Sequence, residues 1–257
     1  MDGDYAAGRD APPDELGPGL LTGSAAFLDG ALANPRLAAE HLVAILRNPA
    51  VTPALIQRIA RSPIWMRIDR LRAAMVVNAR TPRRLAMTLL PTLRWGDLLR
   101  ASGTPQIAST VRSSAAAILG VRLPELEPGE RVTLARAAPA TLIPLLLRES
   151  DPMVARAVLD NPRTRGEDAL AMVDRPDAPP AVLKVVADCP RFAGLEELQL
   201  VIAAHPRTPV VTALKLVNAL QAGALTRLVA SESLPSLVRV AATRRLGETG
   251  DGSRTIV

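Results

Sequence analysis

The chain carries a long internal match, which constrains its fold more than any other feature. When residue 34 is placed on residue 161, residues 34–119 align with residues 161–246 without a gap, with 25 identities in 86 aligned positions. Most identities are prolines at breaks, or leucines and alanines at regularly spaced apolar positions. Because self-similarity at a fixed spacing is typical of repeat architectures, the match predicts two copies of one structural unit.

Short segments with helical periodicity, separated by prolines, fill both copies. Pairs of a polar residue and proline, such as Asn34-Pro35, Asn48-Pro49 and Asn161-Pro162, recur mostly 13 to 16 residues apart. Between them, apolar residues fall at i, i+3, i+4 and i+7, the spacing of one helix face. Proline fits the first turn of a helix, and a polar residue before it can cap that turn. Proline also moves the residue before it out of helical geometry, so each pair is expected to end one helix and start the next. Such short helices are stable only against neighbours. The prediction is an all-α fold: an α-solenoid, or α-α superhelix, of short Pro-delimited helices, internally duplicated.

Composition sets the expected domain boundaries. Residues 1–20 are rich in Asp, Gly and Pro, and residues 247–257 are polar, so both are predicted to be disordered tails. Residues 21–246 are predicted to form a single helical-repeat domain. Within it, 34–119 and 161–246 are the duplicated halves and 120–160 is a helical insert.

The composition also limits the possible chemistry and location. Hydrophobic residues make up 48% of the chain and aromatic residues 2%, which predicts an aliphatic core. The single cysteine, Cys189, excludes an internal disulfide and any cysteine-rich metal site. The first residues show no signal peptide, and no apolar run reaches the roughly 18 residues needed to span a bilayer. We therefore expect a cytoplasmic protein with no membrane partner.

A family resemblance rests on three segments, 48–60 (NPAVTPALIQRIA), 78–90 (NARTPRRLAMTLL) and 205–217 (HPRTPVVTALKLV). Their shared pattern, N-P-x-x-(T)-P-x-x-L-x-x-L, resembles that of bacterial leucine-rich repeat variant proteins and their HEAT-like relatives, over about residues 34–246. The resemblance implies a helical solenoid used for protein interaction or scaffolding. Some members carry an added cysteine cluster, from which this chain departs because it has only Cys189.

No catalytic constellation is visible. The sequence contains no H-E-x-x-H, G-x-x-x-x-G-K-[ST], G-x-G-x-x-G or G-x-S-x-G motif. His205 is expected to have a turn or capping role, and His41 is expected to be solvated. Cys189 is expected to be a structural cap at a helix start. A helix N-terminus can lower a thiol pKa, so Cys189 is the one residue with latent reactivity. The chain is therefore predicted to have no catalytic residue, no cofactor and no metal, and not to be an enzyme.

Charge and aromatic residues single out the first copy as the candidate binding surface. Residues 34–119 hold 13 arginines against three acidic residues, a net +10, whereas residues 161–246 have a net +3. Both tryptophans lie in the first copy. Because Trp and Arg are enriched at binding hot spots, partner binding is predicted at Trp65, Arg67, Arg70, Arg94 and Trp95, with Arg67 and Arg70 on one helix face. The alternative is that Trp65 fills a gap between helices and the arginines are solvated.

Three functions remain to be distinguished. The favoured one is a protein–protein interaction scaffold or adaptor that docks an unknown, acidic protein or peptide. The alternative is a nucleic-acid or anion binder with an Arg-rich surface, although the scarcity of lysine and stacking aromatics counts against it. A HEAT-like DNA glycosylase would need a carboxylate beside an aromatic pocket, and the sequence shows none. A continuous basic groove would favour the second function and a mixed surface the first.

Overall fold

The computed structural model describes residues 2–231 and 234–251, and its regular elements in this part of the chain are all helices. It divides into two compact units, residues 1–124 and 125–257. The elements of the first unit are α1 (Asp2–Asp10), α2 (Pro13–Thr22), α3 (Ala25–Ala31), α4 (Ala39–Arg47), α5 (Pro53–Ala60), η1 (Trp65–Arg67), α6 (Asp69–Val76), α7 (Arg83–Leu89), η2 (Leu90–Thr92), α8 (Trp95–Gly103) and α9 (Ser109–Arg122). A 3-10 turn, η3 (Leu123–Glu125), lies at the division.

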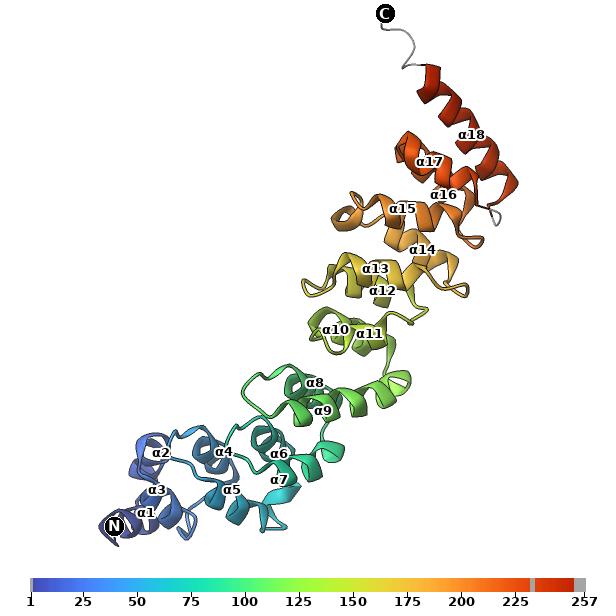
Figure 1. Cartoon of the computed structure of the whole chain (residues 1–257). Coiled ribbons are helices and arrows are strands. Elements are labelled where there is room, and N and C mark those ends of the chain that lie inside the picture. Colours follow the sequence, from blue (N-terminus) through green and yellow to red (C-terminus); the bar gives the residue numbers. More distant parts are fainter. Residues whose placement is uncertain (1, 232–233, 252–257) are drawn as a thin grey trace, which may run out of the picture. The chain divides into compact units, whose positions relative to one another are not determined.

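The second unit repeats this composition of short helices (Figure 1). Its elements are α10 (Pro128–Ala137), α11 (Ile143–Leu146), α12 (Pro152–Asp160), α13 (Gly166–Val173), α14 (Pro180–Ala187), η4 (Pro190–Phe192), α15 (Glu196–Ala204), α16 (Val210–Ala219), α17 (Ala222–Val229) and α18 (Ser236–Asp251). No helix in the described residues combines the length and the apolar character needed to cross a membrane.

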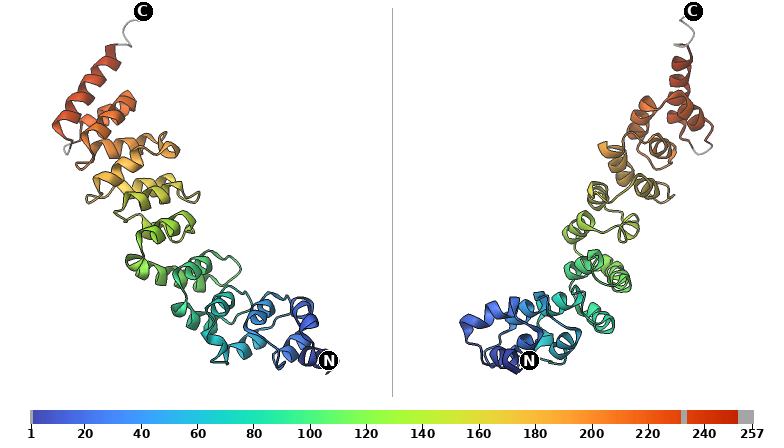
Figure 2. Two further views of the ribbon diagram at one scale, coloured as in Figure 1. Left: turned by 180° about the vertical axis from the view of Figure 1, so that it is seen from behind. Right: turned by 60° about the vertical axis from the view of Figure 1, so that its left-hand side comes forward.

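Alternate helices pack against each other, and in the second unit these contacts form two rows. In the first unit α2 contacts α4 and α4 contacts α6, while α1 contacts α3 and α7 contacts α9. In the second unit α13, α15 and α17 follow one another in one row, and α10, α12, α14, α16 and α18 in the other. The rotated views of Figure 2 show that each unit is built from short helices that follow one another closely. The core between the rows is aliphatic as expected, with fully buried residues such as Leu42, Ile56 and Leu71.

Helices of the two units begin at corresponding positions. The first residues of α3 to α9 lie at 25, 39, 53, 69, 83, 95 and 109, and those of α12 to α18 at 152, 166, 180, 196, 210, 222 and 236. Each pair of starts is separated by the interval that separates residue 34 from residue 161 in the internal match. The ends of α1 and α10, Asp10 and Ala137, are separated by that interval as well. The short 3-10 turns η1 and η4 are the exception, since they are offset from this register by two residues.

Buried asparagines tie each turn to the preceding helix pair. The Nδ2 group of Asn34 donates to the carbonyls of Gly8 (3.2 Å) and Ala11 (3.0 Å), and its Oδ1 accepts from the Arg36 N–H (2.9 Å). The Nδ2 group of Asn161 donates to the carbonyls of residues 135 and 138, both at 2.9 Å, and its Oδ1 accepts from the residue 163 N–H. The partners of the two asparagines therefore stand at corresponding positions of the two units. Asn48 makes the same kind of contact to the carbonyls of residues 20 and 23.

The role expected for the Asn-Pro pairs is therefore confirmed for ending a helix and wrong for starting the next one. Asn48 and Asn161 end the helices α4 and α12, and the next helices begin only several residues later. An amide has both donors and an acceptor, so it can bridge two chain segments, which a simple N-cap does not require. The expectation holds at Asp151-Pro152, where Asp151 Oδ1 accepts the Met153 N–H (2.8 Å) at the start of α12.

The predicted amino-terminal tail is also wrong. Most of residues 2–22 form α1 (Asp2–Asp10) and α2 (Pro13–Thr22), and Leu16 and Leu20 are fully buried. Gly8, which lies in the predicted tail, has a packing role, because a Cβ there would overlap the carbonyl oxygen of Phe27. Gly30 in α3 has the matching role, because its Cβ would overlap the carbonyl oxygen of Tyr5. Glycine thus allows α1 and α3 to approach closely.

The other predicted boundaries change as well. At the carboxyl end, α18 continues to Asp251, so residues 247–251 are helical, and the rest of the predicted 247–257 tail lies outside the described residues. The predicted 21–246 domain is replaced by the two compact units that divide at residue 124. The predicted insert, 120–160, contains the end of α9 and the helices α10 to α12, which occupy positions corresponding to α1 to α3.

Candidate functional site: an arginine-lined groove on the first unit

A groove of about 580 Å³ crosses α4, α6 and the start of α8 in the first unit. Its walls combine aliphatic and charged side chains: Val43, Leu46, Ala73, Ala74 and Val77 with Arg47, Asp69, Arg70, Asn78, Arg94, Asp97 and Arg100. Four arginines against two aspartates give the lining a net charge of +2. An apolar groove with a few charged groups can hold an extended segment and orient it through its charges.

The salt bridges in the groove leave two guanidinium groups without a partner. Arg94 pairs with Asp69 at 2.9 Å, and Arg100 with Asp97 at 3.8 Å. Asp69 also forms a salt bridge with Arg72, which lies one turn further along α6. Within the described residues Arg47 and Arg70 form no hydrogen bond or salt bridge, and both side chains are exposed. Their full hydrogen-bonding capacity is therefore open to a ligand.

Arg47 and Arg70 also line a second hollow. This hollow of about 330 Å³ is bounded by Ala39, Glu40, Val43, Ala44, Arg47, Ile68 and Arg70. Since both hollows share Val43, Arg47 and Arg70, the two arginines lie where the hollows adjoin. A ligand in either hollow would be within reach of the same pair of cations.

The predicted binding residues divide into two groups. Arg70 and Arg94 line the groove, whereas Trp65, Arg67 and Trp95 do not. Trp65 is half-buried in η1, and Trp95 is the half-buried first residue of α8. Arg67 ends η1, while Arg70 belongs to α6. The extended residue Ile68 separates them, so the expectation of one shared helix face is wrong.

Arg47 and Arg100 complete the groove but were not singled out from the sequence. A signal for Arg47 was present in the internal match, because Arg47 aligns with Asp174 just as Arg70 aligns with Glu197. The positions corresponding to the six charged groove residues are Asp174, Glu196, Glu197, Gln221, Ala224 and Arg227. Their net charge is −2, and Arg227 pairs with Glu197 at 3.0 Å. The charge of this face therefore reverses between the two units.

The histidines and the cysteine lie outside the groove. His205 fills the position of Asn78: its Nε2 faces the carbonyl of Arg175 at 3.0 Å, and its Nδ1 accepts the Arg207 N–H. This confirms its turn role. His41 is not simply solvated, because its Nδ1 accepts the Ala38 N–H at the start of α4. Cys189 is buried beside the three-residue turn η4 and makes no capping hydrogen bond, so its expected capping role is wrong.

Metal binding has no visible basis in the described residues, since they contain no group of three or more His, Cys, Asp or Glu side chains able to hold an ion. Comparisons with family models, curated proteins and solved structures found no match to this chain. The groove is therefore interpreted from its own residues.

Proposed function

We propose that the chain is a non-catalytic, internally duplicated α-solenoid that acts as a protein–protein interaction scaffold and binds an acidic segment in the first-unit groove. The observation that carries the proposal is the charge reversal between the units. Arg47, Arg70 and Arg94 line the groove, and Asp174, Glu197 and Gln221 stand at the corresponding positions. Arginine-rich codon usage alone would enrich both units, and does not account for acidic residues at the corresponding positions.

The duplication and the solenoid are supported by the corresponding helix starts, the two rows of helices in the second unit and the corresponding ties of Asn34 and Asn161. These features fit the resemblance to leucine-rich repeat variant and HEAT-like proteins, which stays a prediction. The absence of a catalytic role and the cytoplasmic location are likewise part of the proposal. Cell fractionation would test the location.

Nucleic acid, or another phosphate-bearing anion, is the second candidate. The unpaired guanidinium groups of Arg47 and Arg70 suit phosphate as well as carboxylate. However, the groove walls are aliphatic, and neither tryptophan lines them. Non-specific binding of single strands draws much of its affinity from bases stacked on aromatic side chains. The groove therefore favours an acidic peptide with apolar residues between its carboxylates.

The test compares two labelled probes of equal length, an acidic peptide and a single-stranded oligonucleotide, by fluorescence anisotropy. We expect the peptide to bind better, and its affinity to fall as salt rises because exposed charges are screened. The double variant Arg47→Glu/Arg70→Glu should lose about tenfold in affinity at low salt, equivalent to about 1.4 kcal/mol. This magnitude is reasonable for two exposed ion pairs of up to about 1 kcal/mol each.

The matched control is Arg83→Glu/Arg84→Glu. It changes the net charge by the same amount on α7, which does not line the groove, and both side chains are exposed. An equal loss in both double variants would show that only net charge attracts the probe. Stronger binding of the oligonucleotide, lost only in the groove variant, would replace the first candidate with the second.

A further inference from the structure

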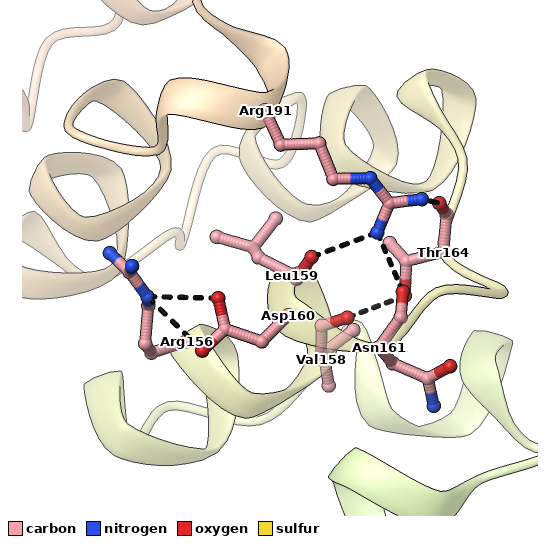
Figure 3. A network of polar contacts seen from close by, with 7 residues as sticks. All are labelled: Arg156, Val158, Leu159, Asp160, Asn161, Thr164 and Arg191. Carbon is pink, nitrogen blue, oxygen red and sulfur yellow. Dashed lines mark hydrogen bonds and ion pairs between the residues drawn. The ribbon is translucent and has the colours of Figure 1, made fainter.

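A single arginine in the second unit fills an array of backbone carbonyls. The Nη1 atom of Arg191 donates to the carbonyls of Leu159 (3.1 Å) and Asn161 (2.7 Å), and its Nη2 to those of Pro162 (3.2 Å) and Thr164 (2.6 Å). Figure 3 shows the side chain reaching from η4 to the turn that follows α12. Four carbonyls, one at the end of α12 and three in the turn after it, thus accept hydrogen bonds from one guanidinium group.

An aromatic ring completes this arrangement. The guanidinium carbon of Arg191 lies 5.0 Å from the centroid of the Phe192 ring. A cation at this distance from a ring face is attracted by the ring quadrupole. The second unit therefore shows what binds at this place: a planar cation with several donors, held between a ring and a carbonyl-lined turn.

The first unit has the same turn without the arginine. Asn34 and Asn161 make the same three hydrogen bonds to corresponding atoms, so the turns that follow them are held alike. Each turn is closed by the same backbone bond of 3.0 Å, from residue 37 to residue 34 and from residue 164 to residue 161. The carbonyls that correspond to the four ligands of Arg191 belong to Leu32, Asn34, Pro35 and Leu37.

In the gap-free sequence alignment, Ile64 stands at the position of Arg191, although η1 begins two residues later than η4 in this register. Ile64 is 76% exposed and has no donor to offer these carbonyls. The side chains of the flanking Arg61 and Arg67 form no hydrogen bond or salt bridge with the described residues. The aromatic position is kept and enlarged, since Trp65 replaces Phe192, and tryptophan is the strongest cation–π partner.

We propose that the first unit binds a guanidinium group from outside the unit, between Trp65 and the carbonyls of Leu32, Asn34, Pro35 and Leu37. Arginine is the ligand class, either as the side chain of a protein partner or as the free amino acid. A lysine ammonium would fit less well, because it cannot spread parallel donors over several carbonyls as a planar guanidinium does. The site does not depend on the anion groove, whose lining shares no residue with it.

The direct test follows the indole N–H signal of Trp65 by NMR during titration with N-acetyl-arginine methylamide. The chain has two tryptophans, and Trp65→Phe assigns the signal. We expect a saturable chemical-shift change with a dissociation constant in the millimolar range, because the ligand is a single side chain. The matched lysine derivative should bind at least severalfold more weakly. Free L-arginine is the third ligand in the test. If it binds as tightly as N-acetyl-arginine methylamide, the free amino acid is a sufficient ligand. If it binds more weakly, the ligand is an arginine side chain within a peptide.

Two substitutions at position 64 make the test specific. Ile64→Arg should occupy the site from within, abolish the titration and raise the melting temperature, whereas Ile64→Leu should change neither. Arg70→Ala in the groove should leave the titration intact. Equal shifts from the arginine and lysine derivatives would overturn the proposal. So would a titration unchanged in Ile64→Arg.

Discussion

The buried asparagine ties allow a quantitative prediction of stability. Asn161 is 1% exposed and makes three hydrogen bonds of 2.9 Å, to the carbonyls of Ala135 and Ala138 and from the Arg163 N–H. In Asn161→Ala these three backbone groups lose their partner, and no side chain replaces it. A hydrogen bond lost from a buried partner costs about 1 kcal/mol, so the free energy of unfolding should fall by about 3 kcal/mol.

The assay is urea and thermal unfolding of the full chain, followed by circular dichroism. For a unit of this size about 1 kcal/mol corresponds to roughly 3–5 °C, so the transition of the second unit should move down by roughly 10 °C. Asn34→Ala should produce a similar loss in the first unit, because Asn34 makes the corresponding bonds. Asn218→Ala, at an exposed position of α16, is the matched control and should change stability by less than about 0.5 kcal/mol.

A second variant separates the donor from the acceptor function. Asn161→Asp keeps an oxygen to accept the N–H of residue 163 but removes both donors and places a carboxylate against two carbonyls. It should therefore be at least as destabilising as Asn161→Ala. A loss below about 1 kcal/mol in Asn161→Ala, or one no larger than in Asn218→Ala, would refute the view that these amides hold neighbouring helix pairs together.

Two further predictions concern packing and charge. Gly30→Ala should destabilise the first unit by about 1–3 kcal/mol, because the added Cβ would overlap the carbonyl of Tyr5. A Cβ at Gly223 in α17 meets nothing within 4 Å, so Gly223→Ala should be neutral or stabilising. Thermal unfolding of the two variants compares these effects. Glu149→Ala should cost about 1–2 kcal/mol in urea unfolding, because it leaves Arg131, only 25% exposed in the pair, without its carboxylate; a neutral effect would contradict this.

The helical fold could be predicted from periodic features of the sequence because those features act locally. Proline stands in the first turn of α5, α10, α12 and α14, where it needs no N–H partner. The gap-free self-match also placed the helix starts of the two copies in register. By contrast, the ties of Asn34 and Asn48 join residues more than 20 positions apart. Local pattern reasoning cannot reveal such partners.

The candidate site could be predicted only in part, for a related reason. Arg70 and Arg94 were found because arginine density marks a charged surface. Arg47 lies far from both tryptophans in sequence and was missed, and the packing of α4 against α6 brings it to the groove. The helical start of the chain was missed because glycines such as Gly8 indicate disorder in sequence, whereas Gly8 allows close contact between α1 and α3.

The short reach of the ties has a consequence for how the chain folds during synthesis. The side-chain hydrogen bonds that tie turns to earlier helices join residues that are close in sequence. Those of Asn78 to Leu46 and of Arg191 to Leu159 each join residues 32 positions apart. Proteins dominated by such local contacts have low contact order and fold fast. Each turn can therefore close onto the previous helix pair once about 30 further residues have left the ribosome, before the rest of the chain exists. A nascent chain stalled after residue 124 should already protect the amide hydrogens of α4 and α6 from exchange with solvent.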